Sequence, residues 1–281
     1  ALKAFTEALF KGSFTPLTHL AILRTQFTEE RIKAFFEALS IGGTNLHHLD
    51  LTSNDIGDTG MKVFAQALVK GGSGLDKLRN LLLGRNNISD EGMEAFAEAL
   101  VKGALNNLEH RDMKALTEAT SKGALDNLQY LNLQDNQIGD QGLKSFAEAI
   151  SKGTLHNLQH LNLRGDQIGD EGIKAFAEAT SKETLKELAT LNLSMNQIGN
   201  EAIKAFSKAL SMGALTNLQS LDLRCNVIAS EGMKAFSDAI SKGALHNLHY
   251  LNLQSNRINS ETAFSNSLLM HPSQPNTCLH G

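Results

Sequence analysis

The sequence predicts an α/β solenoid, a rod of short parallel strands with helices along one side. Similar stretches begin every 30 residues, at Leu128, Leu158, Leu188, Leu218 and Leu248. A fixed period of roughly 20–50 residues is typical of a solenoid, because a single unit buries its apolar face only when neighbours stack on it. Within each unit the apolar period changes from two to about 3.6 residues, which predicts a strand followed by a helix.

The Leu158 unit shows the strand most clearly. Leu161 and Leu163 alternate with His160, Asn162 and Arg164. Because successive side chains of a strand point to opposite faces, the two leucines are predicted to point into the core and the three polar residues outward. Equivalent alternation in the other units predicts one parallel sheet along the rod.

A helix is predicted after each strand. Asp170 precedes the helix of the Leu158 unit and can cap its free N–H groups, and Gly153 suits a left-handed helix end in the preceding unit. The buried helix stripe of the Leu158 unit is expected to contain Ile173, Phe176, Ala177 and Thr180. A phenylalanine column is predicted to pack in the core rather than to bind a ligand: Phe35, Phe64, Phe96, Phe146, Phe176, Phe206 and Phe236.

A polar position recurs three residues after the last leucine of each unit. It is Asn in most units, for example Asn136, Asn196 and Asn226. An Asn side chain can satisfy both N–H and C=O groups of a tight turn, so these amides are predicted to form a ladder along the rod. Asp166 occupies this position in the Leu158 unit. An ionised carboxylate accepts hydrogen bonds but cannot donate them, so we expect a local weak point there.

The repeats are predicted to occupy residues 1–264, with a partial repeat at 1–12 and a shortened repeat at 108–127. Only 20 residues separate Leu108 from Leu128, so that unit lacks its strand end, turn and helix start. We therefore expect a missing or very short strand and a change of curvature there. Residues 265–281 lack the repeat and are predicted to form a tail. The chain begins inside a helix and without Met, which predicts a fragment of a longer array or an incomplete gene product.

The bulk properties argue against some partners. The formal net charge is -4 and the pI is about 6.2, which predicts no nucleic-acid and no membrane partner. No apolar run approaches the roughly 20 residues of a transmembrane helix. Two cysteines, Cys225 and Cys278, make no disulfide framework, so an intracellular, cytoplasmic location is predicted.

The pattern L-x-x-L-x-L-x-x-N-x-I-G-D-E-G-x-K-A-F-A-E-A resembles the long, helix-containing class of leucine-rich repeat. That class includes ribonuclease inhibitor, the Ran GTPase-activating protein and the sensor domains of NOD-like receptors. The resemblance covers residues 17–256 and implies a right-handed horseshoe with a concave parallel sheet and convex helices. The chain departs from ribonuclease inhibitor in having two Cys and no Trp, and from the activator in lacking acidic residues after Glu261. The activator's functional arginine matches no position here.

The outward strand residues are predicted to line the concave face and to bind a partner protein. Tyr and Arg commonly anchor protein interfaces, and the acids concentrate on the helices, which favours an acidic partner surface. The predicted partner-binding residues are His48, Asp50, Arg85, Tyr130, Asn132, Gln134, His160, Asn162, Arg164, Asn192, Asp222, Arg224, Tyr250 and Asn252.

Other chemistry has weaker support. His19 and His48 are predicted neighbours, but a metal site needs further ligands and only Asp50 is near, so incidental surface histidines are favoured. The strand-end arginines either meet a partner's carboxylate or phosphate or are solvated charges. Cys225 has no neighbouring His and is interpreted as a spare thiol. No catalytic residues, metal or cofactor are predicted.

The sequence thus predicts a non-enzymatic scaffold or sensor module that recognises a partner protein through the concave sheet. The resemblance implies two alternatives. One is a GTPase-activating protein for a Ran-like small GTPase. The other is the ligand-sensing fragment of a NOD-like receptor.

Overall fold

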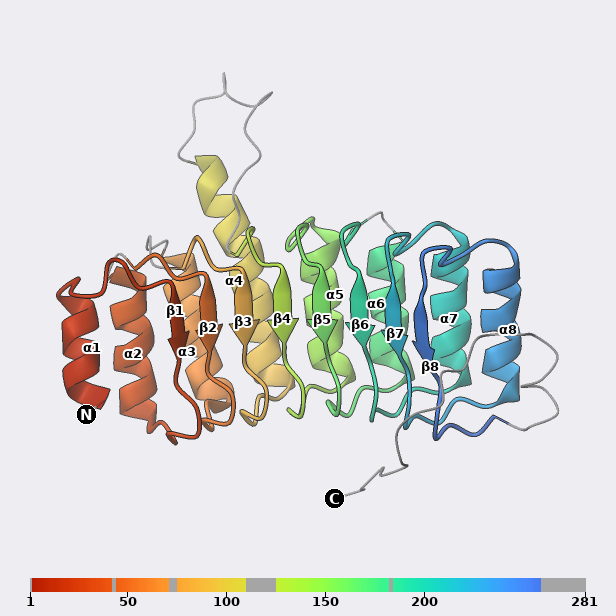
Figure 1. Ribbon diagram of the computed structural model, residues 1–281, viewed down its shortest axis with the longest axis horizontal. Coiled ribbons are helices and arrows are strands. Elements are labelled where there is room, and N and C mark those ends of the chain that lie inside the picture. Colours follow the sequence, from red (N-terminus) through yellow and green to blue (C-terminus); the bar gives the residue numbers. More distant parts are fainter. Residues whose placement is uncertain (1, 42–43, 71–74, 110–124, 182–183, 259–281) are drawn as a thin grey trace.

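The computed structural model describes residues 2–41, 44–70, 75–109, 125–181 and 184–258 (Figure 1). Their strands form a single parallel sheet whose spatial order follows the chain. The strands are β1 (His19–Ala21), β2 (His48–Asp50), β3 (Asn80–Leu82), β4 (Tyr130–Asn132), β5 (His160–Asn162), β6 (Thr190–Asn192), β7 (Ser220–Asp222) and β8 (Tyr250–Asn252). The helices are α1 (Leu2–Phe10), α2 (Glu29–Ile41), α3 (Gly57–Val69), α4 (Asp90–Glu109), α5 (Asp140–Ser151), α6 (Asp170–Thr180), α7 (Asn200–Ser211) and α8 (Ser230–Ser241).

The expected α/β solenoid is confirmed, with the helices all on one face of the sheet (Figure 1). Neighbouring strands lie about 4.8 Å apart, whereas packed helices need about 8–10 Å. The row of helices therefore extends beyond the row of strands at both ends (Figure 1). This mismatch places the strands on the inner, concave side of the rod.

The core lies between the sheet and the helices. The predicted phenylalanine column is confirmed as core, since all seven rings are less than 2 % exposed. The leucines of successive strands pair in register, as Leu131 does with Leu161 and Leu161 with Leu191. Each buried Phe or Leu contributes about 1.5–3 kcal/mol of transfer free energy, so these columns hold the rod together.

The predicted asparagine ladder is confirmed, and Asn196 shows its geometry. Its Nδ2 donates to the carbonyl of Leu193 in its own unit at 3.1 Å and to that of Leu163 in the preceding unit at 2.8 Å. Its Oδ1 accepts the backbone N–H groups of Asp166 and Ile168, both at 3.0 Å. One buried amide therefore satisfies groups of two adjacent units.

Asp166 interrupts this ladder. Its Oδ1 accepts the backbone N–H of Asn136 at 2.8 Å, but its buried Oδ2 has no hydrogen-bond partner. The carbonyls of Leu133 and Leu163 therefore receive a bond from one Asn each, instead of two. Burial raises the pKa of Asp166 well above its usual value, because water no longer solvates the charged form. The weak point predicted from the sequence is thus a buried carboxyl with one unpaired oxygen, at the position where other units have a donating amide.

The prediction that Asp170 caps its own helix is wrong. Asp170 is the first residue of α6, and no side chain caps that helix from its N-cap position. Asp170 Oδ1 instead accepts the N–H of Gly199 in the next unit at 2.7 Å. Asp140 likewise accepts the N–H groups of Gly169 and Gly172, at 2.7 and 2.9 Å. Each of these aspartates therefore caps the following unit's helix.

The glycines of the G-D-E-G motif explain why the cap crosses between units. A Cβ on Gly172 would lie 2.7 Å from Asp140 Oδ1, closer than atoms normally approach. Glycine leaves space for the carboxylate of the preceding unit to reach the helix N-terminus. At the matching position of α7 the chain has Ala202, and Asp170 bonds only Gly199 there.

Among the described residues, no strand lies between β3 and β4, where a strand of the shortened unit would be expected. β3 pairs directly with β4, Asn80 opposite Tyr130, in the same register as every other neighbouring pair. This confirms the missing strand that the sequence predicts, while the change of curvature stays a prediction. Residues 110–124 of that unit and the tail at 265–281 lie outside the described residues.

Helix α4 is longer than its neighbours, with 20 residues, and its end projects beyond the others (Figure 1). The segment G-A-L-x-N-L occurs at 103–108 and again at 213–218. At 213–218 it forms a turn in which Leu215 has a φ of 52°, whereas at 103–108 it continues α4. The same six-residue pattern therefore takes two conformations, which depend on the rest of the unit around it.

Candidate partner-binding face

The strand face away from the helices is not covered by any described helix or strand (Figure 1). Two rows of outward side chains cross it, and each row pairs in register from strand to strand. The first row contains His19, His48, Asn80, Tyr130, His160, Thr190, Ser220 and Tyr250. The second row contains Ala21, Asp50, Leu82, Asn132, Asn162, Asn192, Asp222 and Asn252.

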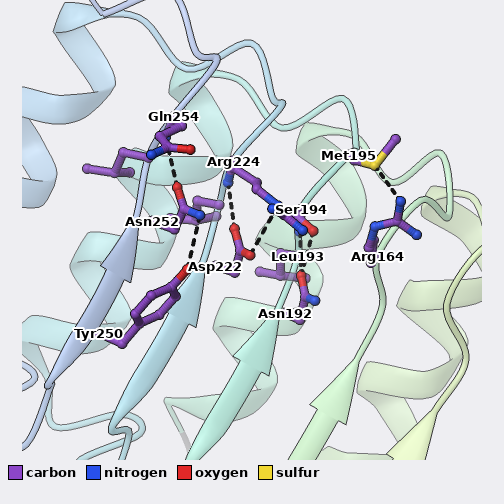
Figure 2. Close-up of polar contacts among 12 residues, drawn as sticks. Arg164, Asn192, Leu193, Ser194, Met195, Asp222, Arg224, Tyr250, Asn252 and Gln254 are labelled. Atoms are coloured by element: carbon purple, nitrogen blue, oxygen red, sulfur yellow. Dashed lines mark hydrogen bonds and ion pairs between the residues drawn. The ribbon is translucent and has the colours of Figure 1, made fainter. Parts of the chain in front are cut away.

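The first row carries the aromatic side chains of the face. The rings of His19 and His48 stack with centroids 5.6 Å apart, and Tyr130 lies 5.7 Å from His160. Tyr250 is 44 % exposed, and its hydroxyl accepts a 3.1 Å bond from Asn252 (Figure 2). Stacked rings on a solvent-facing sheet provide flat contact area for a partner at low conformational cost.

The second row has a structural role that the sequence did not reveal. Each Asn or Asp in it accepts the backbone N–H two residues later and so closes the turn that ends its strand. For example, Asn192 Oδ1 accepts the Ser194 N–H at 3.0 Å. The same bond is made by Asp50, Asn132, Asn162, Asp222 and Asn252. One side-chain oxygen of each of these six Asn and Asp residues is therefore already bonded within the chain.

The strand ends carry a chain of ion pairs, which we call the rim. Asp135 accepts from Arg164 Nη1 at 2.6 Å and from Arg85 Nε at 3.1 Å, so one carboxylate joins three units. Gly165 makes this possible, because a Cβ there would lie 2.7 Å from Asp135 Oδ1. Arg164 Nη2 also lies 2.8 Å from Met195 Sδ (Figure 2).

Arg224 forms the other rim pair. Its Nε lies 3.3 Å from Asp222 Oδ2, while its backbone N–H donates to Asp222 Oδ1 at 3.0 Å (Figure 2). Burial raises the pKa of Asp222, and its hydrogen bond from the Arg224 backbone and the charges of Arg224 and Arg164 oppose that rise. Asp222 is therefore a partly buried acid whose charge is balanced by the rim arginines.

The sequence suggested a mildly basic concave face, and these ion pairs reduce that basic character. Arg85, Arg164 and Arg224 are all near acids of the chain itself, so the rim is not an uncompensated basic surface. Sequence reasoning missed Asp135. Stacking the units would place it beside Arg164, but it meets Arg85 only because β3 and β4 are neighbours.

Two further expectations can be compared with the structure. Cys225 is disulfide-bonded, so its interpretation as a spare thiol is wrong; spacing alone did not reveal the bond. His19 and His48 are neighbours as expected. No group of three or more His, Cys, Asp and Glu side chains in the described ranges is placed to hold a metal ion.

Comparisons with known proteins indicate the same architecture. A family model described as "Leucine Rich repeat" matches more than half of the chain, at residues 44–65, 77–97, 125–147, 154–177, 185–207, 214–237 and 244–263. A search of curated protein sequences gives no match. In the portions that the structure describes, no helix is long and apolar enough to cross a membrane.

The solved structures that are similar to the chain include a tropomodulin domain and a TLR13 chain. The tropomodulin C-terminal domain of Caenorhabditis elegans is 14 % identical with a TM-score of 0.45, over 66 % of this chain and 92 % of that one. The TLR13 chain of a TLR13–ssRNA13 complex is 20 % identical with a TM-score of 0.46, over 94 % of this chain and 32 % of that one. This chain thus spans about a third of that second structure's length.

Proposed function

This chain belongs to the leucine-rich repeat family, whose repeats are generally protein-interaction modules, and we propose that it binds a partner protein through its concave face. It acts as a scaffold or sensor module, not as an enzyme. The residues that we propose as contacts are those predicted from the sequence, with the first row and the rim making most of the contact.

One observation carries the proposal. The in-register sheet presents a row of polar side chains, mostly His, Tyr and Asn with Thr190 and Ser220 between His160 and Tyr250, that no described element covers. The helices of such a solenoid lie on one face of its sheet, so a polar, aromatic strip is left for contact on the other face. Tyr130 and Tyr250 lie in this strip on β4 and β8, far enough apart to hold a partner at two points.

Site-specific cross-linking tests the proposal. A photoreactive amino acid replaces Tyr130 or Tyr250 on the concave face and, as the matched control, Lys144 or Lys174 on the helices. We expect the concave probes to cross-link one protein from native cell extract, identified by mass spectrometry, and the helix probes to leave it unlabelled. The triple variant Tyr130→Ala, His160→Ala, Tyr250→Ala should abolish that product while the melting temperature stays nearly unchanged. Equal labelling from both faces would reject the concave face.

The alternatives implied by the resemblance require their own tests. A GTPase activator should accelerate single-turnover GTP hydrolysis by a Ran-like GTPase, and no acceleration across several GTPases excludes it. A receptor fragment should be preceded in its gene by a phosphate-loop domain. Both alternatives rest on the resemblance and on no contact among the described residues.

The compartment is likewise a proposal. The cysteine count favours an intracellular, cytoplasmic location, whereas the disulfide at Cys225 favours an oxidising compartment. Alkylation of the protein in freshly lysed cells decides between them, because a cytoplasmic chain should react at Cys225 without prior reduction.

A further inference from the structure

The rim arginines differ in how much of each guanidinium is used. Arg85 and Arg224 each contact an aspartate through Nε, and their side chains are 58 % and 40 % exposed. No described residue accepts from the Nη atoms of either one. Arg164 is 24 % exposed, with Nη1 on Asp135 and Nη2 on Met195. Arg85 and Arg224 therefore each present a fork of N–H donors to solvent, while Arg164 uses both of its Nη groups in contacts within the rim.

The carboxylates of Asp135 and Asp222 are already engaged by donors of the chain. Asp135 accepts from Arg85 at one oxygen and from Arg164 at the other. Asp222 Oδ1 accepts the Arg224 backbone N–H, and its Oδ2 forms an ion pair with Arg224 Nε at 3.3 Å. Each oxygen of the two aspartates therefore already faces a donor of the chain, whereas the Nη groups of Arg85 and Arg224 face no acceptor among the described residues. Because the two aspartates hold the guanidinium planes, less side-chain entropy is lost when an acceptor binds.

A guanidinium fork fits a carboxylate or a phosphate. The rim and second row also contain Asp50, Asp135 and Asp222, which would repel a continuous phosphate backbone, and the chain's net charge is -4. Two separate carboxylates can each meet the exposed Nη groups of one arginine, on the side away from its aspartate, and need not continue along the face past the other acids. The charge distribution therefore favours an acidic protein segment over a nucleic acid.

We propose that Arg85 and Arg224 bind the carboxylates of an acidic, extended segment of the partner protein. This inference rests on the proposed concave-face function and adds the partner's chemistry. Arg85 follows β3 and Arg224 follows β7, four strand spacings away, which is about 19 Å. An extended chain advances about 3.3 Å per residue, so the acidic positions of the segment should be about six residues apart.

Labelled synthetic peptides test this directly by fluorescence anisotropy. One peptide has two Glu pairs six residues apart, a second has the same composition with the four Glu adjacent, and a third has Gln for Glu. The spaced peptide should bind about three-fold tighter than the clustered one, and the Gln peptide should not bind. Arg85→Gln and Arg224→Gln should each weaken binding about 2- to 5-fold, since a solvent-exposed ion pair contributes modestly.

The matched control is Arg24→Gln. Arg24 is exposed at the end of β1 with the same left-handed backbone as Arg85, but outside the span between the two forks. Its replacement removes the same charge and should leave the affinity within two-fold. Circular-dichroism melting checks that every variant is folded.

Several results would overturn the proposal. The proposal is wrong if the spaced Glu peptide fails to bind at 50 mM salt, or if the Gln peptide binds as tightly as it does. It is also wrong if Arg24→Gln weakens binding as much as Arg85→Gln. Binding of single-stranded RNA and not of the Glu peptide would contradict it as well. Cross-linking from Tyr130 is independent of these results. A partner captured there without Glu-peptide binding would reject the acidic chemistry and leave the proposed function standing.

Discussion

The Leu158 and Leu188 units are 30 residues apart and begin their strands and helices at matching positions, yet their central turns are held differently. In the Leu188 unit, the amide of Asn196 donates to two carbonyls and accepts two N–H groups. In the Leu158 unit, Asp166 accepts one N–H and leaves a buried oxygen unpaired. The exchange of one NH₂ for one oxygen removes the donor without changing the fold.

The difference shows where the stability of a repeat rod resides. Leucines and phenylalanines set the stacking of the units, but any unit can supply them. The Asn side chain connects a unit to its predecessor through buried hydrogen bonds, so its loss weakens one joint and leaves the others intact. Substitutions at Asn196, Asp166 and the helix caps test this difference in order of decreasing effect.

Asn196→Asp should extend the defect to a second joint. The carbonyls of Leu163 and Leu193 lose the donor at this position, and a second buried carboxyl comes next to Asp166. We expect the free energy of unfolding to fall by about 3–4 kcal/mol, measured by urea denaturation at pH 7. Asn162→Asp is the matched control on the concave face. It should cost no more than about 1 kcal/mol, because it keeps the turn-closing bond, as Asp50 and Asp222 do, and loses only the part-buried bond to Gln134 Oε1.

Asp166→Asn should repair the ladder. The new Nδ2 group can donate to the carbonyls of Leu133 and Leu163, so stability at pH 7 should rise by about 2 kcal/mol. Because burial raises the folded-state pKa of Asp166 above 3.8, its contribution to stability is complete below about pH 4. That contribution is lost as the pH rises through the folded-state pKa.

The difference between Asp166→Asn and the native chain should therefore widen with rising pH and then level off. Urea titrations from pH 3 to pH 8 measure it, with the exposed Asp238→Asn as the control. A difference that is constant over this range would show that the pKa of Asp166 is the same in the folded and unfolded chains, contrary to the effect of its burial.

The helix caps should give the smallest effect. Asp140 accepts two N–H groups of the Leu158 unit, and Asp170 accepts one of the Leu188 unit. Asp140→Ala should therefore cost about 1.5–2 kcal/mol and Asp170→Ala about 1 kcal/mol, by thermal or urea unfolding. Equal costs for the two variants would mean that the second bond of Asp140 adds nothing to stability.

Much of the fold could be predicted because one unit repeats. The residue types at Leu161, Phe176 and Asn196 recur at the same spacing in other units, so a wrong assignment in one unit is corrected by comparison with the others. The direction of the Asp170 side chain could not be predicted, since both its own helix and the next one offer free N–H groups. Only the stacked structure shows that Gly199 is the nearer donor.

The rim shows how far the candidate site could be predicted from the sequence. Arg164 and Asp135 could be paired by aligning consecutive units, but Arg85 belongs to a unit 50 residues before Asp135 in the chain. Their contact requires that the chain between β3 and β4 adds no strand. The turn-closing bonds of Asn132 and Asn192 are local, yet a polar outward residue also fits a partner contact, so sequence alone did not separate the two roles.

The direct pairing of β3 with β4 has a consequence for how such a chain can be altered. The chain between these strands is nearly twice as long as between the others, yet their register is the same. Doubling a loop adds only about 0.6 kcal/mol of closure entropy. The part of this stretch that follows α4 is thus a natural insertion point for a peptide tag or a small domain, whereas α4 itself carries core residues such as Phe96.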